Sequence, residues 1–389
     1  MQADYVLVGG GLQNGLVALA VAAHQPAARI AMIERGEAPG GNHTWCFHAG
    51  DLAPAMQAWI DPLVVARWDG YDVAFPRHAR TLASPYACVS SERLAAEVTR
   101  TLARPGSQLL ARTSALEVHT DRVVVKRETG ETQTVTGTVV IDARGPDTEV
   151  APTGCGWQKF VGQELRLTAP HGLTRPMLMD ATLPQTDGFR FMYVLPLAAD
   201  RLLVEDTYFS DGTRIDAAHL RAEIERYCTQ HGWQIAEVVR EETGVLPLPW
   251  KCAPPVASAP LVGGYAGGWF HPVTGYSFPI AARLAELVAT RPATALFGAA
   301  LSDLVAAQTK QMKFALRLNT MLFKWFPPDQ RFQVLARFYR LPEPIIRRFY
   351  ALAMTGMDRA RILVGRPPKG LSITAALGFG KAARAAEAT

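Results

Sequence analysis

The fold is decided by one stretch near the start of the chain, Gly9-Gly10-Gly11-Leu12-Gln13-Asn14-Gly15. The apolar run 5–8 precedes it, an Ala/Leu/Val-rich run 16–23 follows it, and a second apolar run covers 29–34. A strand, a turn, a helix and a strand in this order form a βαβ unit. The glycines permit a tight turn and a close approach of the backbone to a pyrophosphate at the N-terminus of the helix.

Individual residues of this unit fit a dinucleotide site. Gly9 and Gly11 occupy the first two positions of the fingerprint G-x-G-x-x-G, and Asn14 stands at the third. Glu34 comes 25 residues after Gly9, at the end of the second strand, where a carboxylate can accept hydrogen bonds from a ribose. Arg35 is either a further cofactor contact or a solvated charge. An ordinary glycine-rich loop is the alternative, but the loop and the acid together favour a dinucleotide.

Two later segments predict that the dinucleotide is FAD. A strand over 139–142 ends in the turn D-A-R-G-P, which in two-part FAD domains returns the chain to the cofactor, so Asp142 is a candidate contact; a plain strand-end turn is the alternative. About 250 residues beyond the first loop, the stretch 263–277 resembles the second FAD motif, with Tyr265 in place of the usual aspartate. A helix expected from about Pro279 would direct its N-terminus at the flavin. The residues that keep the pattern are Gly267, Gly268, Pro272 and Gly275.

The run 201–208 carries two acids, Glu205 and Asp206, among apolar neighbours. Because side chains alternate along a strand, the two acids point to opposite faces, and we expect one of them to face an apolar interior. Burial raises the pKa of a carboxyl, so that it can hold a proton near neutral pH as a general acid must. A satisfied structural acid or an exposed edge strand is the alternative.

Composition excludes several classes of protein. The chain has 389 residues, of which 49% are hydrophobic and 19% charged, enough for a large packed core. We see no run of roughly 18 apolar residues that would span a membrane, and no secretory signal. The five cysteines are widely spaced without a CxxC motif, which fits a reducing cytoplasm. His43 and His48 stand five residues apart, but no third ligand lies near them, so we expect no metal.

Charge is concentrated at the C-terminal end. Residues 307–389 hold 15 lysines and arginines against 4 acidic residues, whereas the other 306 residues hold 25 basic and 31 acidic ones. Basic and aromatic residues alternate there with apolar ones, which suits a helix lying on an anionic membrane surface. A packed helical subdomain with a solvated basic face is the alternative. We expect no nucleic acid partner, because no known binding motif accompanies the charge.

The predicted elements divide this α/β chain into four parts. A helix is expected near 91–103, strands at 122–127 and 133–142, and a hairpin formed by 189–196 and 201–208. From about Asp303 onward the pattern is helical. The parts are a Rossmann-type FAD-binding domain in two pieces (1–150 and 256–300), an inserted substrate domain with an antiparallel sheet (151–255), and a basic helical membrane-facing region (301–389).

These motifs together resemble the bacterial lycopene β-cyclases, a family of FAD-dependent carotenoid cyclases. The resemblance extends over nearly the whole chain. The segments that carry it are the first glycine loop, GGNHTWCFH at 40–48, DARGP at 142–146, RLLVEDTYFS at 201–210, FHPVTGYSFP at 270–279, FYRLPEPIIRRFYA at 338–351 and RILVGRPP at 361–368.

The resemblance implies a fold related to the aromatic hydroxylases and an isomerisation with no net redox change. It implies that NAD(P)H serves only to keep the FAD reduced. Glu205 is then the essential acid, which protonates lycopene or a related acyclic carotenoid, and Asp206 takes the second acidic place. It also implies a cytoplasmic protein held peripherally at the inner membrane, where contact with other carotenoid enzymes is expected. Whether Glu205 or the flavin delivers the proton stays open.

A carbocation mechanism needs side chains that stabilise positive charge without trapping it, and aromatic faces do this. The candidates for contact with the substrate or its cations are Trp269, Phe270, His271 and Tyr276. An FAD-dependent monooxygenase or a prenyl or carotenoid reductase would use the same two glycine loops but would not need the acid. A non-catalytic flavin or lipid carrier would tolerate the loss of both acids.

Overall fold

The structure is a computed structural model, and it describes residues 2–145, 154–364 and 371. Pro146, the expected domain boundary at 150, the second half of RILVGRPP and the Ala-rich tail lie outside the described residues.

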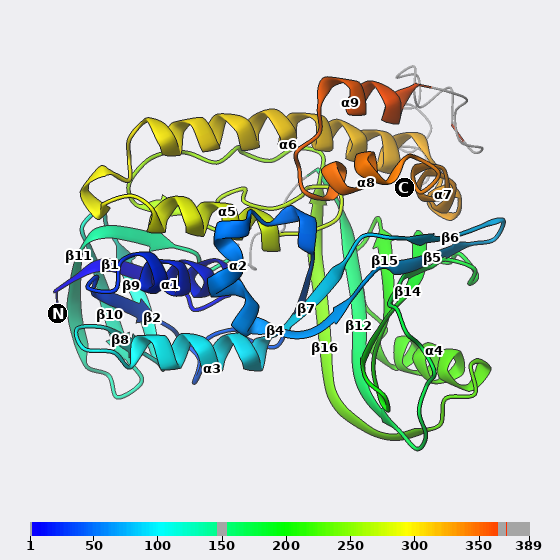
Figure 1. Ribbon diagram of the computed structural model, residues 1–389, viewed down its shortest axis with the longest axis horizontal. Coiled ribbons are helices and arrows are strands. Elements are labelled where there is room, and N and C mark those ends of the chain that lie inside the picture. The colour runs from blue at the N-terminus through cyan, green and yellow to red at the C-terminus, as the bar shows by residue number, and fades with distance from the viewer. Residues whose placement is uncertain (1, 146–153, 365–370, 372–389) are drawn as a thin grey trace, which may run out of the picture.

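The first sheet carries the N-terminal βαβ unit (Figure 1). Its strands are β8 (Gln108–Leu110), β2 (Ile30–Ile33), β1 (Gln2–Val8), β11 (Thr132–Asp142), β10 (Arg122–Arg127), β9 (Thr113–Val118) and β17 (Leu261–Val262), which pairs with β11. β1 runs parallel to β2 and β11, and β17 runs parallel to β11. The carboxyl ends of these strands therefore meet at one edge, and both glycine loops start there.

The helix of the βαβ unit, α1 (Leu12–His24), begins four residues before the run 16–23 that predicted it. Gly11 has an extended conformation and is its N-cap, so the glycine loop leads directly into the helix. α1 packs against α5 (Phe278–Ala289) and α3 (Ser91–Leu102). The helix expected near 91–103 is confirmed as α3, and the Ser90 hydroxyl caps it by accepting the Arg93 backbone N–H at 3.2 Å.

The second sheet is antiparallel except where β13 pairs with β5. Its strands, in spatial order, are β16 (Ile235–Pro249), β12 (Cys155–Leu167), β15 (Arg201–Ser210), β14 (Phe189–Ala198), β13 (Met177–Asp180), β5 (Tyr71–Phe75) and β6 (His78–Leu82). The predicted hairpin is confirmed as β14 and β15. β5 and β6 come from the first 150 residues, so the sheet draws on two of the four proposed parts; that division remains a proposal.

A three-stranded sheet and a helix pack beside the two larger sheets. A small sheet of β3 (Thr44–His48), β7 (Tyr86–Ser90) and β4 (Val64–Trp68), with α2 (Pro54–Ile60) close by, lies between the larger sheets (Figure 1). α4 (Ala217–Gln230) covers one face of the second sheet, where Ile224 packs in a separate core with Val161 and Val204. The opposite face of that sheet is therefore free to shape a site.

The C-terminal segment is helical, as predicted. It consists of α6 (Ala299–Trp325), α7 (Phe332–Phe338), α8 (Glu343–Tyr350) and α9 (Gly356–Leu363), with breaks at Pro327-Pro328 and Pro342. Arg331 anchors it, because this buried guanidinium donates to the Phe209 carbonyl at 3.3 Å and to Asp211 at 2.7 Å, at the end of β15. No helix in the described part of the chain is long and apolar enough to cross a membrane.

Candidate active site

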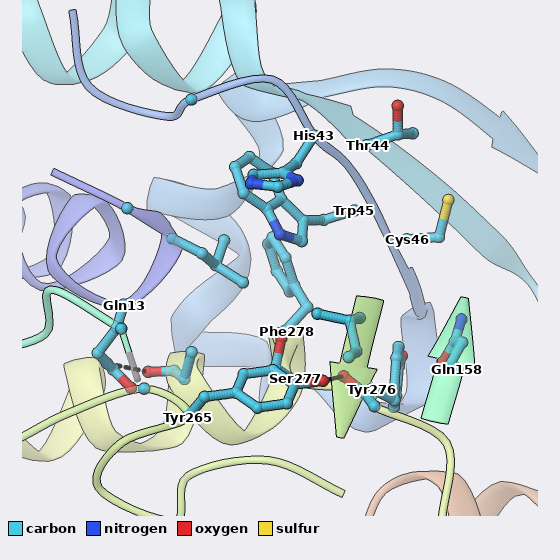
Figure 2. A pocket seen from close by; sticks show the side chains of 18 of the residues that line it. Gln13, His43, Thr44, Trp45, Cys46, Gln158, Tyr265, Tyr276, Ser277 and Phe278 are labelled. Carbon is cyan, nitrogen blue, oxygen red and sulfur yellow. Dashed lines mark hydrogen bonds between the residues drawn. The ribbon is translucent and has the colours of Figure 1, made fainter. Parts of the chain in front are cut away.

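A cavity of about 550 Å³ is lined by loops of the first large sheet and by strands of the second. Its lining begins at the first glycine loop, passes strand β3 and the second glycine loop, and ends on β14, β15 and β16 of the second sheet. Figure 2 shows Gln13 and Tyr265, one from each glycine loop, at one side of this lining and Gln158 at the other. The cavity therefore links the predicted dinucleotide site with the strand that carries the acid pair.

The shape of the first glycine loop allows a ligand to approach its backbone closely. Gly9 has φ +88°, and a Cβ there would lie 2.9 Å from the Ala143 carbonyl oxygen, so only glycine fits without strain. Glu34 stabilises the conformation of the loop, because its carboxylate accepts hydrogen bonds from the backbone N–H groups of Gly10 and Gly36, each at 2.7 Å. Gly9, Gly10 and Glu34 all line the cavity, together with Gly11.

Asn14 replaces the third fingerprint glycine and turns away from the cavity. Its amide donates to the carbonyls of Val8 and Gly9, both at 2.9 Å, and thereby fixes the end of β1 against the start of α1. The close helix packing usually given by the third glycine falls to Gly15 instead. A Cβ on Gly15 would lie 3.1 Å from the Leu94 side chain on α3.

Two guanidinium groups, Arg35 and Arg144, line the same end of the cavity. Asp142 itself is not part of the described lining. It forms a two-point ion pair with Arg144, at 3.0 Å to Nε and 2.7 Å to Nη2, and so orients that side chain. Positive charge beside a glycine loop suits an anionic ligand such as a pyrophosphate.

The second glycine loop presents Tyr265 and Gly275 to the cavity. The Tyr265 hydroxyl donates to the Gly275 carbonyl at 2.6 Å, and its ring stacks on Phe270 with centroids 4.2 Å apart. Gly275 has φ +68°, and a Cβ there would lie 2.8 Å from the Tyr265 hydroxyl. The tyrosine that replaces the usual aspartate thus holds the loop closed by its own hydrogen bond.

Gly267, Gly268 and Pro272 support this loop from behind and do not belong to the described lining. Gly268 has φ +75°, and a Cβ on Gly267 would overlap a backbone oxygen of β17. The Pro272 carbonyl accepts the Asn319 amide at 2.6 Å, which joins the loop to α6. These three residues therefore shape the loop.

The four predicted substrate contacts divide into two pairs. Trp269 and Tyr276 line the cavity, whereas Phe270 and His271 lie behind the wall. His271 is fully buried, its Nε2 lies 2.9 Å from the Phe349 carbonyl, and burial lowers its pKa to about 3. A neutral, hydrogen-bonded imidazole in this position anchors the loop to α8.

The start of α5 faces the cavity through Ser277 and Phe278 (Figure 2). Gln13 joins the first loop to this helix, since its amide donates to the Ala281 carbonyl at 3.1 Å. The N-terminus of a helix carries unpaired N–H groups and a partial positive charge. This arrangement confirms the predicted helix and directs it at the space between the glycine loops.

Glu205 lies at the other end of the cavity, on the face of β15 opposite α4. Only 9% of the residue is exposed, and the Thr207 hydroxyl donates to its carboxyl. Burial, and after it the charge of Glu242, raise the pKa of Glu205 to about 8. The side chain therefore holds its proton at neutral pH, in the state that a general acid requires.

The chamber around Glu205 is largely apolar. Tyr193 pairs with Glu205 across β14 and β15, and its hydroxyl lies 3.1 Å from that of Tyr86. The apolar side chains that the second sheet contributes to the cavity include Phe160, Leu178, Met179, Phe191, Phe209, Val245 and Leu246. Of these residues only Phe209 belongs to a motif quoted from the sequence, although alternation along β14 and β15 identifies the faces on which several of them lie.

Asp206 does not reach the cavity, although the sequence placed it beside Glu205 in the catalytic set. It is fully buried on the opposite face, where Arg190 donates to both its oxygens at 2.9 and 2.8 Å and also binds Glu223 at 2.7 Å. Tyr208 donates to the same carboxylate at 3.3 Å. Strand alternation separates the two acids, so only Glu205 can meet a ligand of the cavity.

Glu242 on β16 lines the cavity as well, and the sequence analysis missed it. Only 4% of it is exposed, and Arg240 donates to its carboxylate at 3.0 Å. Burial raises the pKa of Glu242, and the Arg240 guanidinium opposes that rise. The available signal was the run Arg240-Glu241-Glu242-Thr243, because its two acids directly precede the apolar stretch 244–249.

A family model described as "Lycopene cyclase protein" matches residues 4–376. The chain belongs to the lycopene cyclase family. It is 41% identical to the lycopene beta-cyclase of Pantoea ananas over 375 residues, which covers 94% of this chain and 95% of that protein. It is 42% identical to the lycopene beta-cyclase of Pseudescherichia vulneris over 377 residues, with 94% of each chain covered. The resemblance seen in the motifs is thereby confirmed.

Solved structures show the same fold at low sequence identity. The flavin-dependent brominase Bmp2 has a TM-score of 0.61 at 13% identity, with 93% of this chain and 97% of that chain covered. The p-nitrophenol 4-monooxygenase PnpA of Pseudomonas putida has a TM-score of 0.60 at 13% identity, with 90% and 99% covered. The predicted Rossmann-type architecture, shared with flavin-dependent hydroxylases and extended by a C-terminal helical region, is confirmed.

Proposed function

We propose that this chain is a lycopene β-cyclase, an isomerase that closes the ψ end groups of lycopene into β-ionone rings and yields γ-carotene and β-carotene. The observation that carries the proposal is the position of Glu205. This protonated acid lies in an apolar chamber that is continuous with a dinucleotide-type glycine loop. Family membership supports the same conclusion. A monooxygenase or a reductase of this fold would have no need of such an acid.

FAD is the cofactor that we propose for the glycine-loop end. The cradle at Gly9 fits a pyrophosphate, and the side-chain oxygens of Gln13 and Gln158, buried and without a described partner, can accept N–H donors of a ligand. A reduced, anionic flavin would supply an electron-rich face beside a developing cation. We assign direct contact to Gly9, Gly11, Glu34, Arg35 and Gly275, and support of the loops to Asn14, Asp142, Gly267, Gly268 and Pro272.

The residues of the chain can carry the ring closure. Glu205 gives its proton to C2 of the ψ end group, which leaves a tertiary cation at C1. The π electrons of C5=C6 then form the C1–C6 bond and move the positive charge to C5. Loss of the C6 proton restores the C5=C6 double bond as a β ring, whereas loss of a C4 proton would give an ε ring.

The wall of the chamber suits the cations. Trp269 and Tyr276 line the cavity, as do Phe191 and Phe209 from the second sheet, and aromatic faces attract positive charge without forming a bond to it. The apolar surroundings also keep water from trapping the intermediate. Phe270 and His271 contribute indirectly, by holding the second glycine loop.

The redox state and the location follow as parts of the same proposal. NAD(P)H would serve only to reduce the flavin, because the substrate and the product are isomers. The substrate lies in a membrane, and the surface of α9 suits contact with one. Met357, Leu363 and Val364 are 83%, 47% and 62% exposed, next to the exposed Arg361. We propose a peripheral position on the cytoplasmic face of the inner membrane, near other carotenoid enzymes.

Pigment analysis tests the activity. The chain is expressed in a bacterium that makes lycopene, and the carotenoids are separated by chromatography and identified by absorption. We expect cyclised carotene. Unchanged lycopene would contradict the proposal, and an oxygenated or saturated product would favour the monooxygenase or reductase.

Anaerobic turnover with chemically reduced FAD and no NAD(P)H should proceed, because the reaction is an isomerisation. Consumption of NAD(P)H in proportion to product would exclude an isomerase.

Replacing Gly9 tests the proposed FAD site. We expect Gly9→Ala to weaken FAD binding about 10- to 100-fold, because a side chain at φ +88° is strained and its Cβ would press on the Ala143 carbonyl. Flavin retained on the purified protein, and titration of the apoprotein with FAD, measure the change. Gly212→Ala is the control, because a Cβ there meets no atom within 4 Å. Equal FAD affinity in both variants would contradict the assignment.

The pH dependence of turnover tests the acid. Since the pKa of Glu205 is about 8, kcat/KM should be level below about pH 7 and fall as pH rises through 8, approaching tenfold per pH unit beyond it. The sign follows from the role, because only the protonated carboxyl can start the reaction. An assay in vesicles loaded with lycopene, buffered from pH 6 to 10, measures the profile. A rate that rises with pH would mean that the ionised form is the active one.

A further inference from the structure

Glu205 and Glu242 share one face of the second sheet and lie on either side of Gly162. In the register of the strands Gly162 on β12 pairs with Glu205 on β15 and with Glu242 on β16. Adjacent strands are about 4.8 Å apart, so the two acids start from backbones roughly 10 Å apart. Both line the cavity.

Because Gly162 has no side chain, the two acidic side chains can approach each other closely over it. A Cβ on this residue would lie 3.3 Å from Cγ of Glu242 and 3.4 Å from both Cβ and Cγ of Glu205. Both acidic side chains therefore lean over the same position. Two carboxyl groups that converge in this way can act on one end group of a substrate held in the cavity beside them.

The two acids have different partners. In the described part of the chain, Glu205 makes no ion pair and accepts its hydrogen bond from the neutral Thr207. Glu242 faces the Arg240 guanidinium, which in turn donates to Asn42 and Thr44 at 2.9 and 2.6 Å. A cation beside one carboxyl favours its ionised form, whereas burial without a cation favours the protonated form. Burial raises the pKa of both carboxyls, but only Glu242 has a guanidinium that opposes the rise, so the proton belongs on Glu205 and the negative charge on Glu242.

We propose that Glu242 is the base that removes the C6 proton and so determines that the ring is a β ring. The proposal rests on the function proposed above. Glu205 loses one proton to C2, the C1–C6 bond forms, and the C6–H electrons become the C5=C6 double bond while the Glu242 carboxylate takes the proton. Transfer of one proton from Glu242 to Glu205 across Gly162 restores the starting state. Atoms and charge balance, and no electrons leave the substrate.

Glu242→Gln tests this role through the product rather than the rate alone. The amide keeps the shape of the side chain but cannot accept the proton, so the C5 cation should lose a proton from another carbon. We expect cyclised products with the double bond displaced, such as ε rings, to rise at least tenfold as a share of the total. Chromatography and nuclear magnetic resonance identify the rings. Glu242→Asp, which keeps a carboxylate, should restore β rings.

Glu241→Gln is the matched control, since Glu241 precedes Glu242 and binds Arg221 and Gln163 on the other face of the strand. It should leave the products unchanged. If Glu242→Gln forms only β rings, whether turnover is fast or slow, the proposal is overturned. If Glu242→Gln binds FAD but forms no rings, β-ring formation by Glu242→Asp supports the role, and failure of both variants overturns it.

The pH profile separates this inference from the proposed function. The charges that act on Glu205 are those of Glu242, which is paired with Arg240, and of Asp206 on the opposite face of β15. The other titratable groups on the walls of the cavity include Tyr193, Cys46 and His43. Removing the charge of Glu242 should move the alkaline fall of kcat/KM to lower pH. An unmoved profile overturns the inference. A fully active Glu205→Gln would instead contradict the acid of the proposed function, whatever Glu242→Gln does.

Discussion

Glu205→Gln should lower cyclisation by about 10³-fold while the protein keeps its fold and its flavin. The amide cannot donate a proton to a carbon–carbon double bond, but it fills the same space and can accept the Thr207 hydroxyl in place of the carboxyl. Turnover of lycopene in vesicles measures the loss. Flavin absorbance and the circular dichroism spectrum show whether the fold and the cofactor remain.

The same variant should gain stability at alkaline pH. The carboxyl of Glu205 has its ordinary pKa of 4.5 in the unfolded chain and about 8 in the folded one, so the folded state loses stability as pH rises between these values. Glutamine has no such proton to lose. Glu237→Gln, on the same sheet but half-exposed and paired with Arg166, is the control and should change neither property. Full cyclisation by Glu205→Gln would contradict the assignment of Glu205 as the general acid.

Much of the fold is predictable from local sequence. The glycine loop, the helix behind it, the hairpin around 199–200 and the proline breaks near 327 and 342 are specified by residues close to one another along the chain. The helix at 278–289 was predicted for the same reason, since Pro279 stands in its first turn. Such signals depend on backbone conformation and on strand alternation, which neighbouring residues determine.

The pairing of distant strands is not visible locally, and the candidate site depends on it. Glu242 meets Glu205 only because β12 lies between β15 and β16, and β16 itself was not predicted. Its sequence has Gly244, Pro247 and Pro249, which disfavour a strand, and its pairing with β12 shifts register twice. Asp206 shows the converse. The resemblance gave it the second acidic place beside Glu205, whereas alternation along β15, which the sequence does predict, puts its side chain on the other face.

Asp206→Asn should destabilise the protein by about 3–5 kcal/mol, because it breaks a buried ion pair and leaves the buried Arg190 with one carboxylate fewer. Burial raises the pKa of Asp206, and Arg190 opposes that rise, so the folded state depends on this pairing. Urea unfolding followed by circular dichroism measures the loss of free energy. Asp121→Asn, in a surface pair with Arg122, should change it by less than about 1 kcal/mol.

The activity of the same variant decides between a structural and a catalytic Asp206. The acid lies behind β15, away from the cavity, so protein that remains folded at low temperature should form β rings within a few-fold of the normal rate. Loss of stability with activity retained is the reverse of what Glu205→Gln should show. If Asp206→Asn were as stable as the parent chain but inactive, Asp206 would have to act on the substrate. Its assignment to the face of β15 away from the cavity would then be wrong.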